Sequence, residues 1–106
     1  MSTYVVAFSP EALEQLAEIV DYIAGKAAPD IADRYASAII SHCEGLQNFP
    51  HGRGTRRDDI RPGLRTTNYK GRTVIAFNVD DAAGTVSIIG IFYGGRDYET
   101  SLKSDF

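Results

Sequence analysis

The residues with the clearest chemical potential in this sequence are arginines gathered in the middle of the chain. Residues 51–72 carry seven basic and two acidic side chains, although the whole protein has a formal net charge of −3. A planar guanidinium can hold a phosphate or a carboxylate through two parallel hydrogen bonds. The segment therefore predicts an anion-binding patch, whose members are Arg53, Arg56 and Arg57.

Other arginines lie near tyrosines, so a binding surface for a macromolecular target is expected beside the patch. The candidates are Arg61, Arg65, Arg72, Tyr93, Arg96 and Tyr98. Arg65 and Arg72 would repel each other if they lay close across the turn at Lys70-Gly71, which favours an anionic partner. The alternative is internal ion pairing with nearby acids, in which Asp97 pairs with Arg65 or Arg72. The acids in question are Asp58, Asp59, Asp80, Asp81 and Asp97.

Metal and cofactor chemistry has little support in the sequence. The one cysteine, Cys43, and the nearby His42 lie in an apolar helical pattern, which is typical of core residues. His51 is expected to be a turn residue, with phosphate contact as the alternative. No P-loop, dinucleotide-binding turn or paired Cys/His metal spacing is present, so we expect neither a cofactor nor a metal.

The first half of the chain predicts a strand and two helices. Residues 4–8 are β-formers, and Ser9-Pro10 is a typical helix start. Residues 10–26 repeat apolar side chains at helical spacing, so one face should pack against the core. That face is expected to include Leu13, Leu16, Val20 and Ile23.

A second helix is expected from Pro29 to residues 48–50, antiparallel to the first. Its apolar positions are Ile31, Tyr35, Ile39, Cys43 and Leu46. Residues 51–59 have no periodicity and predict a loop.

The second half predicts three strands, at residues 64–69, 72–79 and 85–93, joined by hairpin turns. Residues 94–106 form a polar tail in which a short helix or a docked segment is expected. The order β-α-α-β-β-β predicts an α+β two-layer sandwich, with a helical hairpin on a mainly antiparallel sheet. Which strand the first one joins is open.

Length and composition are typical of one globular domain over residues 1–106. No apolar run is long enough for a membrane span, and the first residues lack the pattern of a secretory signal. A cytoplasmic protein is expected.

Several segments, taken in order, resemble the ParE/RelE superfamily of bacterial type II toxins. They are Ser9-Pro10-Glu11-Ala12, residues 46–52 (LQNFPHG), residues 61–65 (RPGLR) and residues 90–99 (GIFYGGRDYE). The last of these is similar to the ending of the ParE branch, and the resemblance covers almost the whole chain. It implies a small toxin that is neutralised by a ParD-like antitoxin, whose otherwise disordered segment wraps around it.

The two branches differ in what the resemblance implies about action. ParE-like members are thought to poison DNA gyrase without catalysis, whereas RelE-like members cut mRNA in the ribosome without a metal. Arg65, Arg72, Tyr93 and Arg96 match the RelE residues only loosely, and an arginine that stays protonated is a poor general base, although Glu99 could serve. We therefore expect a gyrase inhibitor, with a RelE-like endoribonuclease as one alternative. The other is a non-toxic module that binds an acidic peptide or nucleic acid.

Overall fold

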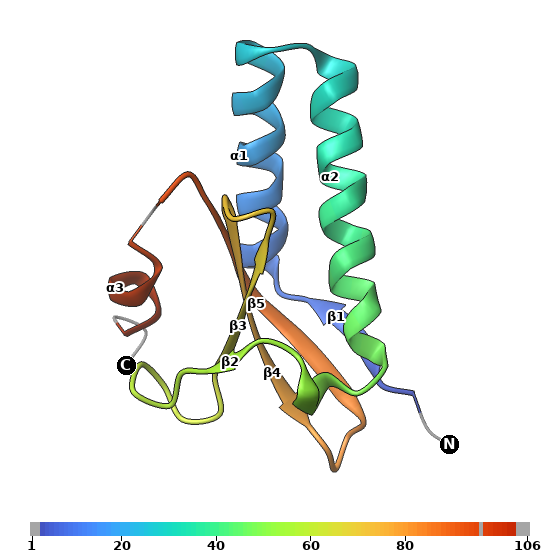
Figure 1. Cartoon of the computed structure of the whole chain (residues 1–106), viewed down its shortest axis with the longest axis vertical. Coiled ribbons are helices and arrows are strands. Elements are labelled where there is room, and N and C mark those ends of the chain that lie inside the picture. Colours follow the sequence, from blue (N-terminus) through green and yellow to red (C-terminus); the bar gives the residue numbers. More distant parts are fainter. Residues whose placement is uncertain (1–2, 96, 104–106) are drawn as a thin grey trace.

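The computed structural model describes residues 3–95 and 97–103. The chain runs through β1, two long helices, a loop with two 3-10 turns, four further strands and a final short helix (Figure 1). Their bounds are β1 Val5–Phe8, α1 Pro10–Lys26, α2 Pro29–Glu44, η1 Gly45–Gln47, η2 Pro50–Gly52, β2 Thr55–Arg56, β3 Arg65–Tyr69, β4 Thr73–Asp80, β5 Thr85–Tyr93 and α3 Tyr98–Lys103.

The five strands form one sheet in the order β1-β5-β4-β3-β2. The neighbours from β2 to β5 are antiparallel, while β1 pairs in parallel with the first half of β5, from Val5 opposite Thr85 to Phe8 opposite Ile88. The α+β class and the antiparallel meander predicted from the sequence are confirmed. The partner of the first strand, which the sequence left open, is β5.

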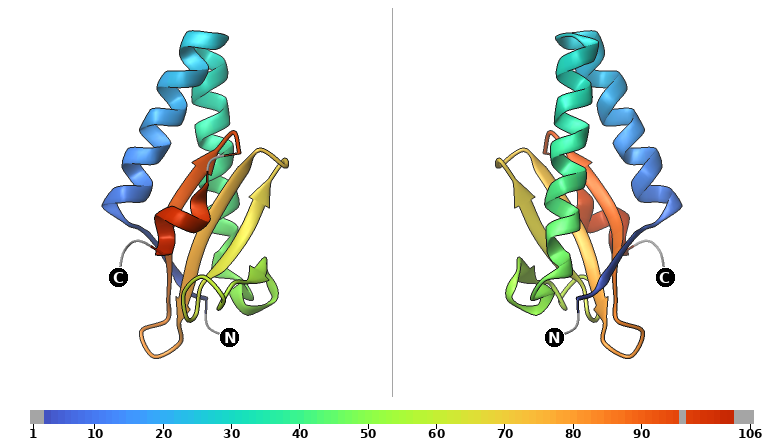
Figure 2. Two further views of the ribbon diagram at one scale, coloured as in Figure 1. Left: turned by 90° about the vertical axis from the view of Figure 1, so that its left-hand side faces the viewer. Right: turned by 90° about the vertical axis from the view of Figure 1, so that its right-hand side faces the viewer.

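The helices α1 and α2 form an antiparallel hairpin on one face of the sheet, and its tip projects past the strands (Figures 1 and 2). The main core lies between the hairpin and the sheet. The side of α1 that enters it is Ala12, Leu16, Ile19 and Ile23. The expected inward position of Leu13 was wrong, because its side chain is 52% exposed and the neighbouring Ala12 is fully buried.

The second helix is shorter than expected. It ends at Glu44, and the chain continues through the 3-10 turn η1, in which Leu46 is buried. Ile31 in its first turn is 44% exposed, so the expected apolar stripe begins one residue later, at the buried Ala32.

The opposite face of the sheet carries α3 (Figure 2). A second, smaller core lies beneath this helix. Its buried members are Ile60, Leu64, Ala76, Phe92 and Leu102. Asp97 caps α3, since its carboxylate accepts hydrogen bonds from the backbone N–H and the hydroxyl of Thr100 at 3.2 and 2.6 Å. The sequence analysis gave pairing of Asp97 with Arg65 or Arg72 as an alternative, and the structure places the Asp97 carboxylate on Thr100 instead. The expected short helix in the tail is confirmed, while Phe106 lies outside the described residues.

The arginine segment is more ordered than a plain loop. It contains η2 and the two-residue strand β2, which pairs with β3 and which the sequence analysis missed. Gly54 makes this possible: its φ is +68°, and a Cβ there would lie 2.4 Å from the Thr66 carbonyl oxygen. Only glycine fits so close an approach of two backbones at positive φ.

Candidate functional site

Two arginines of the predicted anion patch are already paired with acids of the same segment or of α3. Arg56 contacts Asp58 at 2.9 Å, and Arg57 contacts Asp59 at 2.9 Å and Glu99 at 2.7 Å. The internal network that the sequence analysis weighed as an alternative therefore exists for these two residues. Arg53 is exposed, and its carbonyl accepts a hydrogen bond from Arg65 Nη1 at 3.3 Å.

Arg57 joins the loop to α3. Besides its two carboxylate partners, Nη1 donates to the Tyr98 hydroxyl at 3.0 Å, and the guanidinium lies over the Tyr98 ring. The hydrogen bond from Arg57 lowers the pKa of Asp59, and the two carboxylates raise the pKa of Arg57 itself. Tyr98 is half-buried against Phe92. Arg57 and Tyr98 thus act as a structural clamp.

The remaining candidates are spread over the sheet. Arg61 donates to the Leu102 carbonyl at 3.2 Å and so also supports α3. Arg65 begins β3 opposite Phe77, whereas Arg72 precedes β4 next to the turn at the other end of that hairpin. The two are therefore not neighbours, so the repulsion that the sequence analysis considered for a close pair does not arise. Arg96 lies outside the described residues.

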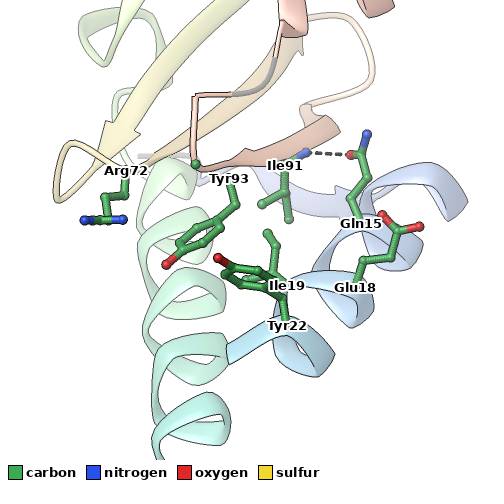
Figure 3. A pocket seen from close by; sticks show the side chains of 8 residues that line it. Gln15, Glu18, Ile19, Tyr22, Arg72, Ile91 and Tyr93 are labelled. Carbon is green, nitrogen blue, oxygen red and sulfur yellow. Dashed lines mark hydrogen bonds between the residues drawn. The ribbon is translucent and has the colours of Figure 1, made fainter. Parts of the chain in front are cut away.

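A groove between α1 and the end of β5 brings Arg72 and Tyr93 together (Figure 3). It has a volume of about 340 Å³. Its lining is Gln15, Glu18, Ile19, Tyr22, Arg72, Ile91, Tyr93 and Gly94.

Aromatic rings dominate one wall of the groove. The Tyr22 and Tyr93 rings lie 5.9 Å apart, and Tyr93 also meets Tyr35 edge-on at 5.8 Å. Tyr35 is fixed in turn by a 2.7 Å hydrogen bond between its hydroxyl and that of Thr73. The groove therefore combines a rigid aromatic surface with the exposed guanidinium of Arg72, which suits it to bind an apolar or aromatic group beside an anion.

Neither histidine lines this groove. His42 packs edge-on against Tyr69, and His51 lies at the far end of the sheet, where its Nε2 is 2.7 Å from an oxygen of Asp81. The Tyr4 hydroxyl donates to the same oxygen at 2.6 Å, and these two bonds lower the pKa of Asp81. The cluster ties β1 and η2 to the turn between β4 and β5.

Residues 3–95 and 97–103 contain no candidate metal site, because no three His, Cys, Asp or Glu side chains among them lie close enough to share an ion. Cys43 is fully buried, and that burial raises the pKa of its thiol to about 12, so it is an inert core residue. Within the same described part of the chain, no helix has the length and apolarity needed to cross a bilayer.

Comparison with known proteins identifies the family. Residues 6–98 match the family model of the ParE toxin of type II toxin–antitoxin systems, parDE. The chain belongs to the ParE toxin family. No curated protein sequence gave a significant match.

Solved structures share the ParE-like fold at low sequence identity. A chain of the chromosomal ParDE system of Pseudomonas aeruginosa superposes with a TM-score of 0.75 at 19% identity, covering 87% of this chain and 97% of that one. A chain of the RelBE2 toxin–antitoxin complex of Mycobacterium tuberculosis gives 0.65 at 20% identity, covering 91% and 97%. A mutant of the E. coli toxin RelE in the free state gives 0.66 at 11%, covering 97% and 96%. The ParE/RelE resemblance seen in the sequence is thus confirmed.

Three groove residues of this ParE-family chain were missed by the sequence analysis, namely Gln15, Glu18 and Tyr22. They stand at spacings of three and four on α1, which places them on one side of the helix. That spacing is present in the sequence, but no local pattern indicates that the end of β5 would lie beside this side of the helix.

Proposed function

We propose that this ParE-family toxin stops bacterial growth by binding DNA gyrase in the cytoplasm, and that a ParD-like antitoxin neutralises it. Family membership supports a toxin of this type. The observation that carries the mode of action is the groove of Arg72, Tyr22 and Tyr93, which offers a rigid aromatic surface and a cation without a nearby imidazole.

Binding rather than RNA cleavage fits the state of the acid–base groups. A 2′-hydroxyl needs a base close to it, and an arginine keeps its proton at neutral pH. Glu99, the base considered from the sequence, is held by Arg57 at 2.7 Å on the α3 side of the sheet. Both histidines are engaged elsewhere, by Tyr69 and by Asp81.

The groove is the proposed target-binding surface, with Arg72 and Tyr93 as its central residues. Arg61, Arg65, Tyr98 and the anion patch stay outside this proposed surface, because Arg56, Arg57, Arg61, Arg65 and Tyr98 each already make a polar contact within the fold. A partner that needs Arg57 or Tyr98 would first have to break the clamp on α3.

The test is expression of the chain with and without the protein encoded beside its gene, followed by assays on purified toxin. We expect growth arrest that the neighbour relieves, inhibition of gyrase supercoiling, and intact ribosome-bound mRNA. Arg72→Ala should lose gyrase inhibition with its melting temperature unchanged. The control Arg34→Ala, at an exposed arginine of α2, should keep both the inhibition of gyrase and the melting temperature.

The results discriminate between the functions. Cuts in translated messages with normal supercoiling would assign the chain to RelE-like endoribonucleases. Normal growth at high levels of folded protein would instead favour the non-toxic binding module.

A further inference from the structure

The outer edge of β5 is covered by β1 only along its first half. The parallel pairing ends at Phe8 opposite Ile88, where the chain turns into α1. Ile89 is an extra residue in the ladder with β4, since Phe77 lies opposite Ile88 while Ala76 lies opposite Gly90. From this bulge onward, the edge of β5 faces α1 and the groove.

Two side chains, one from Ser9 at the N-cap of α1 and one from Gln15 within α1, take the place of β1 just beyond the bulge. The Ser9 hydroxyl donates to the Ile89 carbonyl at 3.0 Å, and Oε1 of Gln15 accepts from the Ile91 N–H at 2.7 Å, the contact drawn in Figure 3. An unpaired strand edge is a template for another strand. The protein thus satisfies part of the exposed edge with local side chains.

The next two polar groups along this edge have no such partner. The Gly94 N–H donates to the Arg72 carbonyl. In an antiparallel ladder the backbone polar groups alternate in direction, so the N–H and C=O of Phe92 point toward β4, whereas those of Ile91 and Tyr93 point away from it. Among the described residues, no sheet pairing, turn or side chain provides a hydrogen-bond partner for the Ile91 C=O or the Tyr93 N–H. Both residues line the groove.

We propose that an extended segment of the antitoxin adds to β5 as a strand in this groove, parallel to β5 and in line with β1. The inference rests on the proposed antitoxin partnership and names its contact site. In parallel pairing, a single incoming residue donates to the carbonyl of one residue and accepts from the N–H two positions later. Ile91 C=O and Tyr93 N–H are such a pair. An antiparallel strand would instead have to pair through the N–H and C=O of Tyr93 alone, because Gln15 occupies the Ile91 N–H, and it would run against the direction of β1.

The groove also sets the side chains that the segment should carry. Ile19 and the Tyr22 and Tyr93 rings offer an apolar contact for one side chain. Arg72 is exposed at the same groove, and no ion pair among the described residues involves it. An acidic side chain next to the apolar one would complement this guanidinium. The occupant is therefore a short extended stretch with one large apolar and one acidic residue.

Amide hydrogen exchange by NMR tests the backbone part of the proposal. In the free chain, the Tyr93 amide should exchange fast while that of Phe92, bonded to β4, exchanges slowly. On adding the protein encoded beside the toxin gene, the Tyr93 amide should become protected to the level of Phe92. Overlapping peptides that tile that protein then locate the segment, which should contain the apolar–acidic pair.

Charge reversal tests the side-chain part. Arg72→Glu should weaken binding of the active peptide roughly tenfold or more, since like charges would meet in the groove. The matched control is Arg34→Glu, an exposed arginine on α2, which should bind as the unaltered chain does.

The outcomes separate this inference from the proposed function. If the neighbouring protein binds and relieves toxicity while the Tyr93 amide stays unprotected, the strand site is wrong and the toxin function stands. Equal affinity of Arg72→Glu and unaltered chain would remove Arg72 from the site. If the neighbouring protein does not bind at all, the antitoxin partnership fails, and the strand proposal fails with it.

Discussion

Nη1 of Arg57 and the hydroxyl of Tyr98 are 3.0 Å apart, which joins a loop residue to the first turn of α3 across 41 positions of sequence. The same guanidinium holds Glu99 one residue later. Because α3 has only six residues and could not persist alone, its position depends on this side chain and on the burial of Leu102.

Replacing Arg57 with alanine should loosen α3 and lower the melting temperature by roughly 4 °C or more, as expected when several charge-assisted bonds are lost from a chain of this size. Arg56→Ala is the control, because Arg56 is more exposed and Asp58 is its one ion-pair partner among the described residues. Differential scanning calorimetry measures the midpoint, and amide exchange in α3 reports local opening. Equal midpoints for the two variants would contradict the clamp.

Acid should remove the stabilisation that Asp97 gives to α3. The Thr100 hydroxyl and N–H hold the pKa of Asp97 below its value in an unfolded chain, near 3.9. The unfolded state therefore binds more protons in that range, and stability rises with pH. The contribution is complete above about pH 5 and disappears as the pH falls through the lower folded value.

The variant Asp97→Ala should accordingly melt below the unaltered chain at pH 7, and the two melting temperatures should converge toward pH 2. Asp21→Ala, which removes an exposed carboxylate of α1, serves as the control. A constant gap between Asp97→Ala and the unaltered chain at every pH would show that the cap does not depend on ionised Asp97.

Substitutions on α1 test which side of the helix is buried. Leu16→Ala should cost about 2–5 kcal/mol in the free energy of unfolding, because the side chain is only 7% exposed. Leu13→Ala, one turn earlier and 52% exposed, should change it by less than about 0.5 kcal/mol. Urea titration followed by circular dichroism gives both values. Similar losses would mean that Leu13 belongs to the core after all.

Alanine substitutions at two glycines with positive φ distinguish the cost of backbone strain from the cost of a steric clash. Gly63→Ala should cost roughly 1–2 kcal/mol, the price of a left-handed alanine, since nothing lies within 4 Å of the added Cβ. Gly54→Ala meets the Thr66 carbonyl oxygen at 2.4 Å in addition, so β2 should separate from β3. Its unfolding free energy should fall well below that of Gly63→Ala, and amide exchange should show β2 open. Equal costs would exclude the backbone contact.

Local signals made most of the fold predictable. Ser9-Pro10 marks the helix start, and the Ser9 side chain indeed accepts from the Ala12 N–H. The three meander strands follow from their period and their turns. The errors came where tertiary contacts decide which side of a helix is buried. Leu13 and Ala12 lie on neighbouring sides of α1, and the helical repeat of apolar residues fits burial of either side.

The candidate site was harder to foresee. Arginine composition identified Arg72, and aromatic residues at the end of β5 identified Tyr93. The pairing of Arg56 and Arg57 with acids, and the approach of Tyr22 to Tyr93, depend on how loop, helix and strand meet. Such long-range placement has no counterpart in local sequence patterns.

The extra residue at Ile89 gives β5 an unusual tolerance for a change in length. Val86 and Ile88 face the helices before the bulge, and Ile91 and Tyr93 face them after it, so the strand has absorbed one position without losing its inner row. Removal of one residue here would close the bulge and leave Val86 opposite Val79 and Ile91 opposite Ile75, so the inner row stays in step. A second deletion, with no bulge left to absorb it, would turn one half of the strand to the wrong face. Relatives of this chain should therefore vary by one residue, and no more, along this strand.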